Sequence, residues 1–192
     1  MANVIKLRKG LNIHLKGTAA QTKRVVGACT EYVVRPDTFE GVVPKLVVHE
    51  GDRVEVGDAL FVDKNFPEVR FASPVSGTVK AVDRGERRKI LGIRLQADEV
   101  QKYHDFGRRD VSTLSADEVK SALLEAGLFG YIYQLPYAVS TNPQTMPKAI
   151  FVSALRDMPL ANNFEYELQG NERDFQTGLS ALSKMATTHL GI

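Results

Sequence analysis

The sequence is poor in cysteine and contains no tryptophan. Cys29 is the one cysteine in 192 residues, which excludes an intramolecular disulfide and any iron–sulfur or zinc site built from several thiolates of this chain. So little cysteine is typical of a reducing, cytosolic compartment. The sequence also lacks an uninterrupted apolar run of about 20 residues, so we expect no membrane-spanning segment.

Glycine-rich turns of the kind that hold phosphate groups are missing as well. The turn after the apolar segment at 149–154 contains no glycine between Leu155 and Asn163, and Pro159 removes a backbone donor that a phosphate cradle would use. We therefore expect no nucleotide or flavin at this turn. The four histidines lack the spacing of metal ligands, so the sequence predicts no metal site and no catalytic constellation.

The net charge of +2 conceals an uneven distribution. The first 24 residues contain six basic and no acidic side chains, whereas residues 110–192 contain five basic against nine acidic ones. The basic residues that are candidates for contact with an anion or a partner are Lys6, Arg8, Lys9, Arg87 and Arg88. For the cluster at 87–89 a solvated hairpin tip is the favoured interpretation, and contact with an anion or a partner is the alternative. No aromatic residues are interleaved with the basic ones, so we do not expect nucleic acid as a partner.

The pattern of short apolar segments divides the chain into four parts. Residues 1–28 form a basic arm in which Leu11, Ile13 and Leu15 alternate as in a strand. Residues 29–96 contain short apolar runs with turn residues every 8–12 positions, which predicts a small β barrel or sandwich. A polar connector follows at 97–114, and residues 115–192 form an α/β region.

The α/β region begins with a strong helix signal. Ser115 and Glu118 have the spacing of a capping box, and Gly127 supplies a C-terminal stop. Residues 148–154 predict a buried parallel strand, and a helix with one apolar face starts near Asp174. Another strand is expected to begin within 188–192. This layout is an incomplete Rossmann-like unit, and we expect the chain to be a fragment of a larger protein or assembly.

Residues 129–137 are the aromatic-rich stretch of the sequence. We expect them to lie in the core or in an interface, and the alternative is contact with an apolar ligand that carries carbonyl groups. The candidate contact residues are Phe129, Tyr131, Tyr133 and Tyr137.

The two turn-rich segments at 50–60 and 73–79 resemble the biotinyl/lipoyl-like barrel-sandwich fold. In carrier members of that superfamily a modified lysine stands on a hairpin between the two segments, and Lys64 is roughly in that place. Methionine is absent beside it and Pro67 follows, so an unmodified surface lysine is the favoured interpretation. A carrier domain modified on Lys64 is the alternative function.

Taken in order, several segments are similar to the A subunit of the Na⁺-translocating NADH:quinone oxidoreductase, the NqrA family. They are residues 6–13 (KLRKGLNI), 61–79 (FVDKNFPEVRFASPVSGTV), 83–88 (DRGERR), 148–154 (KAIFVSA), 159–161 (PLA) and 175–179 (FQTGL). The resemblance covers essentially the whole chain. One departure is that the family form carries arginines where Tyr133 and Leu135 stand here.

The resemblance implies an α+β protein with a barrel-sandwich domain followed by a Rossmann-like domain. It is also similar to the flavin-binding subunit of respiratory complex I and to the Rnf C subunit, with their cofactor sites lost. It implies a peripheral subunit on the cytoplasmic face of the bacterial inner membrane. Its partners would be the membrane subunits, especially the B subunit that bears quinone and flavin. NADH, flavins and iron–sulfur centres would belong to other subunits, while a quinone contact is a hypothesis for 129–137.

Overall fold

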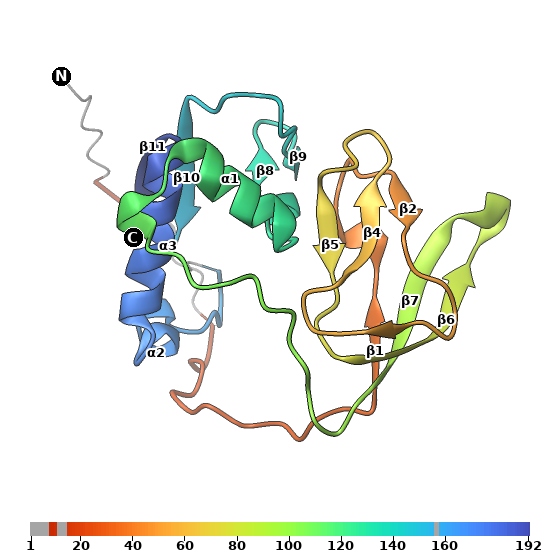
Figure 1. Ribbon diagram of the computed structural model, residues 1–192. Coiled ribbons are helices and arrows are strands. Elements are labelled where there is room, and N and C mark those ends of the chain that lie inside the picture. Colours follow the sequence, from red (N-terminus) through yellow and green to blue (C-terminus); the bar gives the residue numbers. More distant parts are fainter. Residues whose placement is uncertain (1–7, 11–14, 156–157) are drawn as a thin grey trace.

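The computed structural model describes residues 8–10, 15–155 and 158–192. The chain forms a β half and a mixed helix–strand half that lie beside each other (Figure 1). The predicted contact residue Lys6 and the predicted strand residues Leu11 and Ile13 lie outside the described residues. In the described part of the arm, residues 8–10 and 15–28 contain no helix or strand, so a folded arm is not seen there.

Two antiparallel sheets make up the β half. One sheet has the strand order β1-β7-β6-β3 and the other has the order β2-β4-β5. Their bounds are β1 Glu31–Val34, β2 Pro44–Leu46, β3 Arg53–Val54, β4 Ala59–Asp63, β5 Arg70–Ala72, β6 Gly77–Arg84 and β7 Ile90–Ala97. Short 3-10 helices lie at Pro36–Thr38 (η1) and Glu86–Arg88 (η2). This arrangement confirms the barrel-sandwich expectation.

The core of the protein sits between these two sheets. Inward positions of β4 and β5 bring Phe61 and Phe71 together, and alternate residues of β6 and β7 add Val79, Ile93 and Leu95. Strands bury every second side chain, because successive side chains point to opposite faces. The alternating apolar pattern of the sequence therefore determines which face of each strand packs inward.

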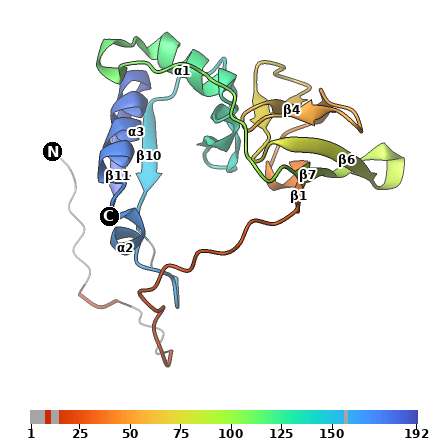
Figure 2. The same ribbon diagram turned by 60° about the horizontal axis from the view of Figure 1, so that its bottom comes forward.

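The described residues of the second half combine three α-helices with two small sheets. Its elements are η3 Val111–Thr113, α1 Ala116–Glu125, η4 Phe129–Tyr131, β8 Tyr133–Gln134, β9 Val139–Ser140, β10 Ala149–Ser153, α2 Phe164–Leu168, α3 Glu172–Met185 and β11 Thr187–Gly191. Strand β11 pairs with β10 in parallel, so β10, α3 and β11 form a β–α–β unit. The view in Figure 2 shows α3 lying along these two strands.

Strand β10 differs from its prediction in one respect. It is parallel, as expected, but it is not buried: Phe151 is 71% exposed, and its ring stacks on His189 of β11 at 5.2 Å between centroids. A parallel strand becomes fully buried when helices cover both faces of its sheet. In the described residues α3 packs on this sheet, and the face that carries Phe151 has no covering layer.

Candidate functional site: the tyrosine hairpin

The most distinctive surface feature is the β8–β9 hairpin together with η4, residues 129–140, which we call the tyrosine hairpin. Its position is fixed first by the end of α1. Gly127 has a φ of +70°, and the N–H groups of Gly127 and Leu128 donate to the carbonyls of Leu124 and Leu123. This is a Schellman arrangement, which satisfies the last carbonyls of a helix and turns the chain sharply. The turn directs the chain onto β5.

Gly130 then brings the backbone against the barrel core. A Cβ atom at this position would lie 2.7 Å from Cζ of Phe71, closer than real side chains approach. Phe129, its neighbour, is 3% exposed and belongs to the core. Phe129 is thus unavailable to a surface ligand, in contrast to its place among the predicted contact residues. The glycine allows the chain to cross the aromatic ring, and Phe129 anchors it there.

A chain of aromatic rings connects the core to the hairpin surface. Phe61 stacks on Phe71 at 4.5 Å, and Phe71 lies 4.4 Å from Phe39. The ring of Tyr131 then meets Phe39 edge to face at 5.1 Å and 80°. Such tilted and edge-to-face pairs are favourable because the ring edge is positive and the face negative. Tyr131 is therefore held in place on its inner side while its outer side faces solvent.

Strand β9 fastens the hairpin to the barrel. The N–H of Ser140 donates to the carbonyl of Glu40 at 2.9 Å. The side chain of Val139 lies against Gly41, where a Cβ atom would be 3.0 Å from that of Val139. Within the hairpin, the hydroxyl of Ser140 donates to the carbonyl of Gly130 at 3.1 Å. The hairpin therefore rests on residues 40–41 of the barrel through β9.

Three tyrosines of the hairpin face solvent. Tyr131 and Tyr133 are exposed, and Tyr137 at the turn is 81% exposed. In the described part of the chain, none of their three hydroxyls has a hydrogen-bond partner. Each presents an apolar ring and a hydroxyl that is open to solvent, which suits an interface or a ligand with carbonyl oxygens.

The sequence did not mark two aliphatic residues of this segment as contact candidates. Leu128 precedes η4 and Leu135 follows β8, and both side chains are exposed. Aliphatic residues carry no chemical signature that separates surface contacts from core residues. Their exposure adds apolar area to the segment that carries the tyrosines, and exposed apolar area can mark an interaction site.

The remaining predicted site residues lie apart from the hairpin. Lys64 is exposed in the connection between β4 and β5, where its N–H donates to the carbonyl of Val43. Arg8 and Lys9 are exposed in the arm, and Arg87 and Arg88 lie at the tip of the β6–β7 hairpin. The structure exposes the three predicted tyrosines on one hairpin, buries Phe129 beneath it, and places these basic residues on other segments.

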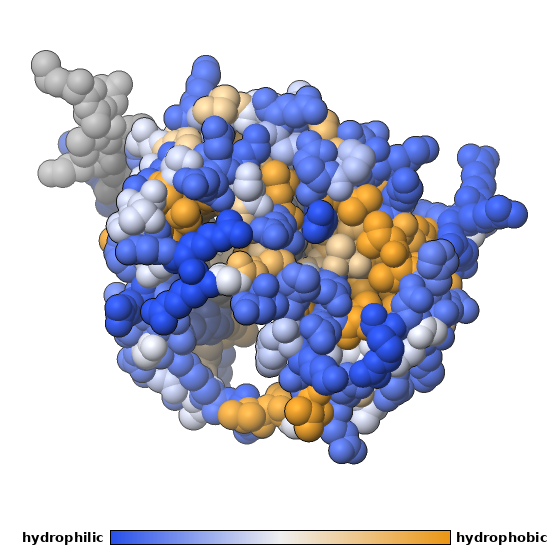
Figure 3. Space-filling view, viewed as in Figure 1, coloured by the Kyte–Doolittle hydropathy of each residue, from blue (hydrophilic) through white to orange (hydrophobic). Residues whose placement is uncertain are grey.

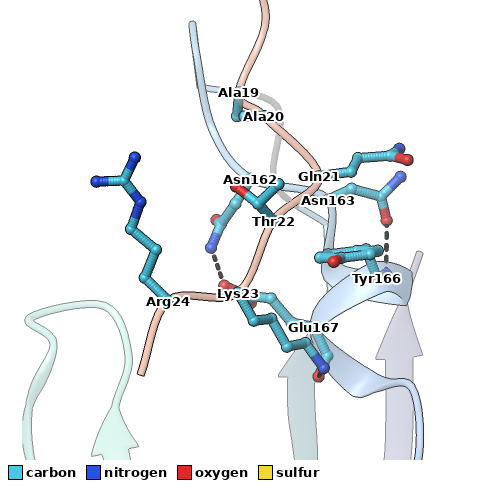
Figure 4. A pocket seen from close by; sticks show the side chains of 10 residues that line it. All are labelled: Ala19, Ala20, Gln21, Thr22, Lys23, Arg24, Asn162, Asn163, Tyr166 and Glu167. Atoms are coloured by element: carbon cyan, nitrogen blue, oxygen red, sulfur yellow. Dashed lines mark hydrogen bonds between the residues drawn. The ribbon is translucent and has the colours of Figure 1, made fainter. Parts of the chain in front are cut away.

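Two shallow cavities in the described part of the chain are lined mainly by polar and charged residues. One, of about 270 Å³, lies between the arm and α2 (Figure 4). There Lys23 Nζ donates to the carbonyl of Glu167 at 3.2 Å and lies over the ring of Tyr166, while Asn163 caps α2 through the N–H of Tyr166. These contacts tether the arm to α2 and offer no catalytic group.

The second cavity, of about 340 Å³, lies at the end of the barrel near Asp58 and Asp98. Arg53 forms a two-pronged ion pair with Asp98 at 2.8 and 2.9 Å. The hydrogen bond from Arg53 is the largest cause that holds the pKa of Asp98 below its usual value. His104 contacts Asp58 at 2.9 Å and thereby fastens the connector to the barrel. The charges here are satisfied internally, as in a structural cluster.

The described residues contain neither a cluster of metal ligands nor a membrane-spanning helix. Among the described residues, no group of three or more His, Cys, Asp or Glu side chains is arranged to hold a metal ion. Within the same residues, no helix is both long and apolar enough to cross a bilayer.

The fold and the surface together define a class: a barrel-sandwich hybrid domain joined to an α/β domain that presents an aromatic hairpin. Two family models match the chain, the NqrA N-terminal barrel-sandwich hybrid domain over residues 5–98 and the NqrA second alpha/beta domain over residues 114–192. The chain belongs to the NqrA family.

Curated relatives agree with this assignment. Proteins named as the A subunit of Na(+)-translocating NADH-quinone reductase are 32% identical in Yersinia pseudotuberculosis and 34% identical in Actinobacillus pleuropneumoniae, each over 184 residues and 95% of this chain. The namesake from Pseudomonas aeruginosa is 31% identical over 189 residues and 97% of this chain. The chain spans about two fifths of the length of these relatives, 41% to 42%.

Proposed function

We propose that this chain serves in a Na⁺-translocating NADH:quinone oxidoreductase as part of its A subunit. In this role it docks on membrane subunits, the B subunit foremost, at the cytoplasmic face of the bacterial inner membrane. It is not catalytic alone, and the flavins, iron–sulfur centres and NADH site belong to other subunits. Two observations support this proposal. The chain belongs to the NqrA family, and its relatives are named as A subunits of Na(+)-translocating NADH-quinone reductase.

The tyrosine hairpin is the observation that carries a more specific role. Tyr131, Tyr133 and Tyr137 present rings and hydroxyls to solvent from a backbone that is fastened to the barrel core. A quinone offers a flat apolar ring and two carbonyl oxygens, which ring stacking and a hydroxyl donor can recognise together. We propose that this hairpin forms one wall of a quinone-contact surface, with the other walls supplied by the membrane partner.

A fixed backbone suits this task. A site that is rigid before its ligand arrives loses less conformational entropy on binding. The edge contact of Tyr131 with Phe39, and the bond from Ser140 to Glu40, fix the inner side of the hairpin before any partner binds. Phe129, which is buried, supports the wall and does not touch the ligand.

Quinone binding by the 192-residue chain tests the hairpin directly. We expect a water-soluble short-chain quinone to bind weakly, with an affinity that Tyr131→Phe and Tyr133→Phe lower by up to about tenfold per lost hydrogen bond. The matched control is Tyr103→Phe, since Tyr103 is exposed on the connector outside the hairpin. Equal affinities for all variants and wild type would overturn the quinone contact.

Membership of the complex is tested separately. The test uses an affinity-tagged A subunit that contains this chain. We expect it to co-purify with membrane subunits and with NADH:quinone reductase activity. Replacing Leu135 and Tyr137, two exposed hairpin residues, by Ser should weaken this co-purification. Purification of the tagged subunit without any membrane partner would contradict the proposal.

A further inference from the structure

The β6–β7 hairpin of the barrel ends in a strongly basic turn. Its cationic residues are Arg84, Arg87, Arg88 and Lys89, which we call the basic tip, and Glu86 is the one acid among them. Figures 1 and 2 both show this hairpin projecting from the barrel on the side away from α1 and α3. The basic tip therefore lies at a convex extremity of the molecule, remote from the tyrosine hairpin.

The backbone of the turn places two arginines at its outermost positions. The N–H of Lys89 donates to the carbonyl of Glu86 at 3.1 Å, and Arg87 and Arg88 between them have φ values of +52° and +61°. Two successive left-handed residues define a type I′ turn, for which Asn-Gly is the preferred pair. Left-handed backbone costs a non-glycine residue roughly 1–2 kcal/mol. The turn thus holds two long cationic side chains where smaller residues would fit with less strain.

The charges of the basic tip are less compensated than others on the barrel. Arg53, Lys80 and Arg94 each have a carboxylate within 2.8 Å. Within the described residues, no side chain of the basic tip has a carboxylate within 4 Å. The interaction it does make is internal, from Arg84 Nη1 to the carbonyl of Arg88 at 3.4 Å. The pKa of Asp37 is lowered mainly by its hydrogen bond from Arg35 and further by the charge of Lys89, so Lys89 is partly compensated. Arg87 and Arg88 form no salt bridge within the described residues and remain a source of positive potential at the end of the turn.

Aliphatic side chains stand beside these cations. Leu91 is 43% exposed and covers Gly85, where a Cβ atom would lie 3.1 Å from its Cδ1. Val33 of β1 lies against Gly92, the residue after Leu91, and is also exposed. Figure 3 shows a hydrophilic projection at the edge of the molecule next to a hydrophobic area. Cations beside aliphatic groups match the boundary between anionic headgroups and acyl chains of a bilayer.

We propose that the basic tip binds the anionic lipid surface of a membrane, with Arg87 and Arg88 in contact with headgroup phosphates. The inference rests on the proposed function, which places the chain beside a bilayer. The tip is a projecting turn, and neither of the two cavities described above contains one of its residues. The exposed leucine and valine beside it favour a lipid surface over a purely acidic protein segment.

Vesicle binding by the 192-residue chain tests this inference. Co-sedimentation is measured with vesicles of phosphatidylglycerol and phosphatidylcholine in equal parts, and with vesicles of phosphatidylcholine alone. The test variant is Arg87→Asn/Arg88→Gly, which removes two charges and installs the pair that the turn prefers, so its fold is retained. The matched control is Lys148→Gln/Arg173→Gln, which removes two charges from exposed sites in the α/β half. Circular dichroism confirms that both variants are folded.

We expect wild type and the control to bind the anionic vesicles alike. The test variant should bind about 10- to 30-fold more weakly, because each basic residue at an anionic surface contributes about fivefold. Equal binding by test variant and wild type would overturn the inference, as would an equal loss in the control or equal binding to phosphatidylcholine alone. Saturable binding of inorganic phosphate at the tip, with displacement from vesicles at millimolar concentration, would show a free-anion site and overturn it too.

These outcomes are independent of the proposed function. The vesicles contain neither quinone nor a membrane subunit, so lipid binding can fail while co-purification with partner subunits succeeds. Conversely, a chain that co-purifies with no partner would still bind anionic vesicles through the basic tip.

Discussion

Gly130 lies directly against the ring of Phe71, and this contact joins the two halves of the protein. The space above the ring is too small for a side chain, since a Cβ atom on Gly130 would lie 2.7 Å from Cζ of Phe71. Phe129 is buried on one side of the glycine, and Tyr131 rests on Phe39 on the other. The position of the tyrosine hairpin therefore depends on a residue that has no side chain.

Gly130→Ala should destabilise the protein and loosen the hairpin. An extra methyl group in a tightly packed place costs typically about 1–3 kcal/mol in the free energy of unfolding, because neighbours must shift. The ring of Phe71 is itself in the core and cannot easily move. Urea unfolding measures the loss.

Gly178→Ala is the matched control for this substitution. Gly178 lies inside α3, and a Cβ atom added there would have no other atom within 4 Å, so alanine should stabilise the protein by about 0.5–1 kcal/mol. If both alanine variants shifted stability in the same direction, the close contact between Gly130 and Phe71 would not be the cause.

Phe39→Leu tests the aromatic contact beneath the hairpin. Phe39 is buried and contacts the rings of Phe61, Phe71 and Tyr131. Leucine keeps most of the apolar volume but removes all three ring–ring contacts, each worth about 0.5–1.5 kcal/mol. We expect a loss of roughly 1.5–4 kcal/mol in unfolding free energy. Tyr103→Leu, at an exposed ring that has no ring–ring contact within the described residues, should change the free energy of unfolding by less than about 0.5 kcal/mol. A comparable loss there would refute the assignment.

Glu31 gives the stability of the barrel a predicted dependence on pH. Its carboxylate accepts hydrogen bonds from Lys80 at 2.5 Å and Arg94 at 3.3 Å, and the bond from Lys80 is the largest cause that lowers its pKa below the usual 4.5. A lowered pKa in the folded state contributes stability above the unfolded value, and that contribution is lost as the pH falls through the folded value.

Melting temperatures of wild type and Glu31→Gln should therefore differ at neutral pH and converge below about pH 4. Glu99→Gln serves as the comparison, because Glu99 is exposed and forms no ion pair within the described residues. Its effect should be small at every pH. A difference between wild type and Glu31→Gln that grew on acidification would contradict the predicted sign.

Local signals in the sequence were reliable where their partners lie within a few residues. The capping box is confirmed: Ser115 accepts from the N–H of Glu118, and the Glu118 carboxylate accepts from the N–H of Ser115. Gly127 ends the helix as predicted, and the type I′ turn at Arg87 and Arg88 confirms a hairpin tip. Each of these features satisfies backbone groups of its own segment, so no distant residue is needed to form it.

Signals that depend on distant packing were less complete. The aromatic stretch was recognisable, but its pattern did not separate Phe129, which is buried, from Tyr131, which is exposed. The difference arises from Phe71 and Phe39 on the barrel, far away along the chain. Burial of β10 also depends on residues far away in the sequence. Its apolar sequence correctly predicted a parallel strand. Phe151 is nevertheless exposed, because full burial requires a covering layer on both faces of the sheet.

The sequence by itself determined the order of strands and helices, the family resemblance and the uneven charge. These properties follow from periodicity, turn-forming residues and composition, which depend only on residues close together in the sequence. The tertiary structure alone decided which aromatic rings face solvent, which cations lack a carboxylate and where Gly130 meets Phe71. Such properties depend on distances between residues far apart in sequence, and only the folded chain sets those distances.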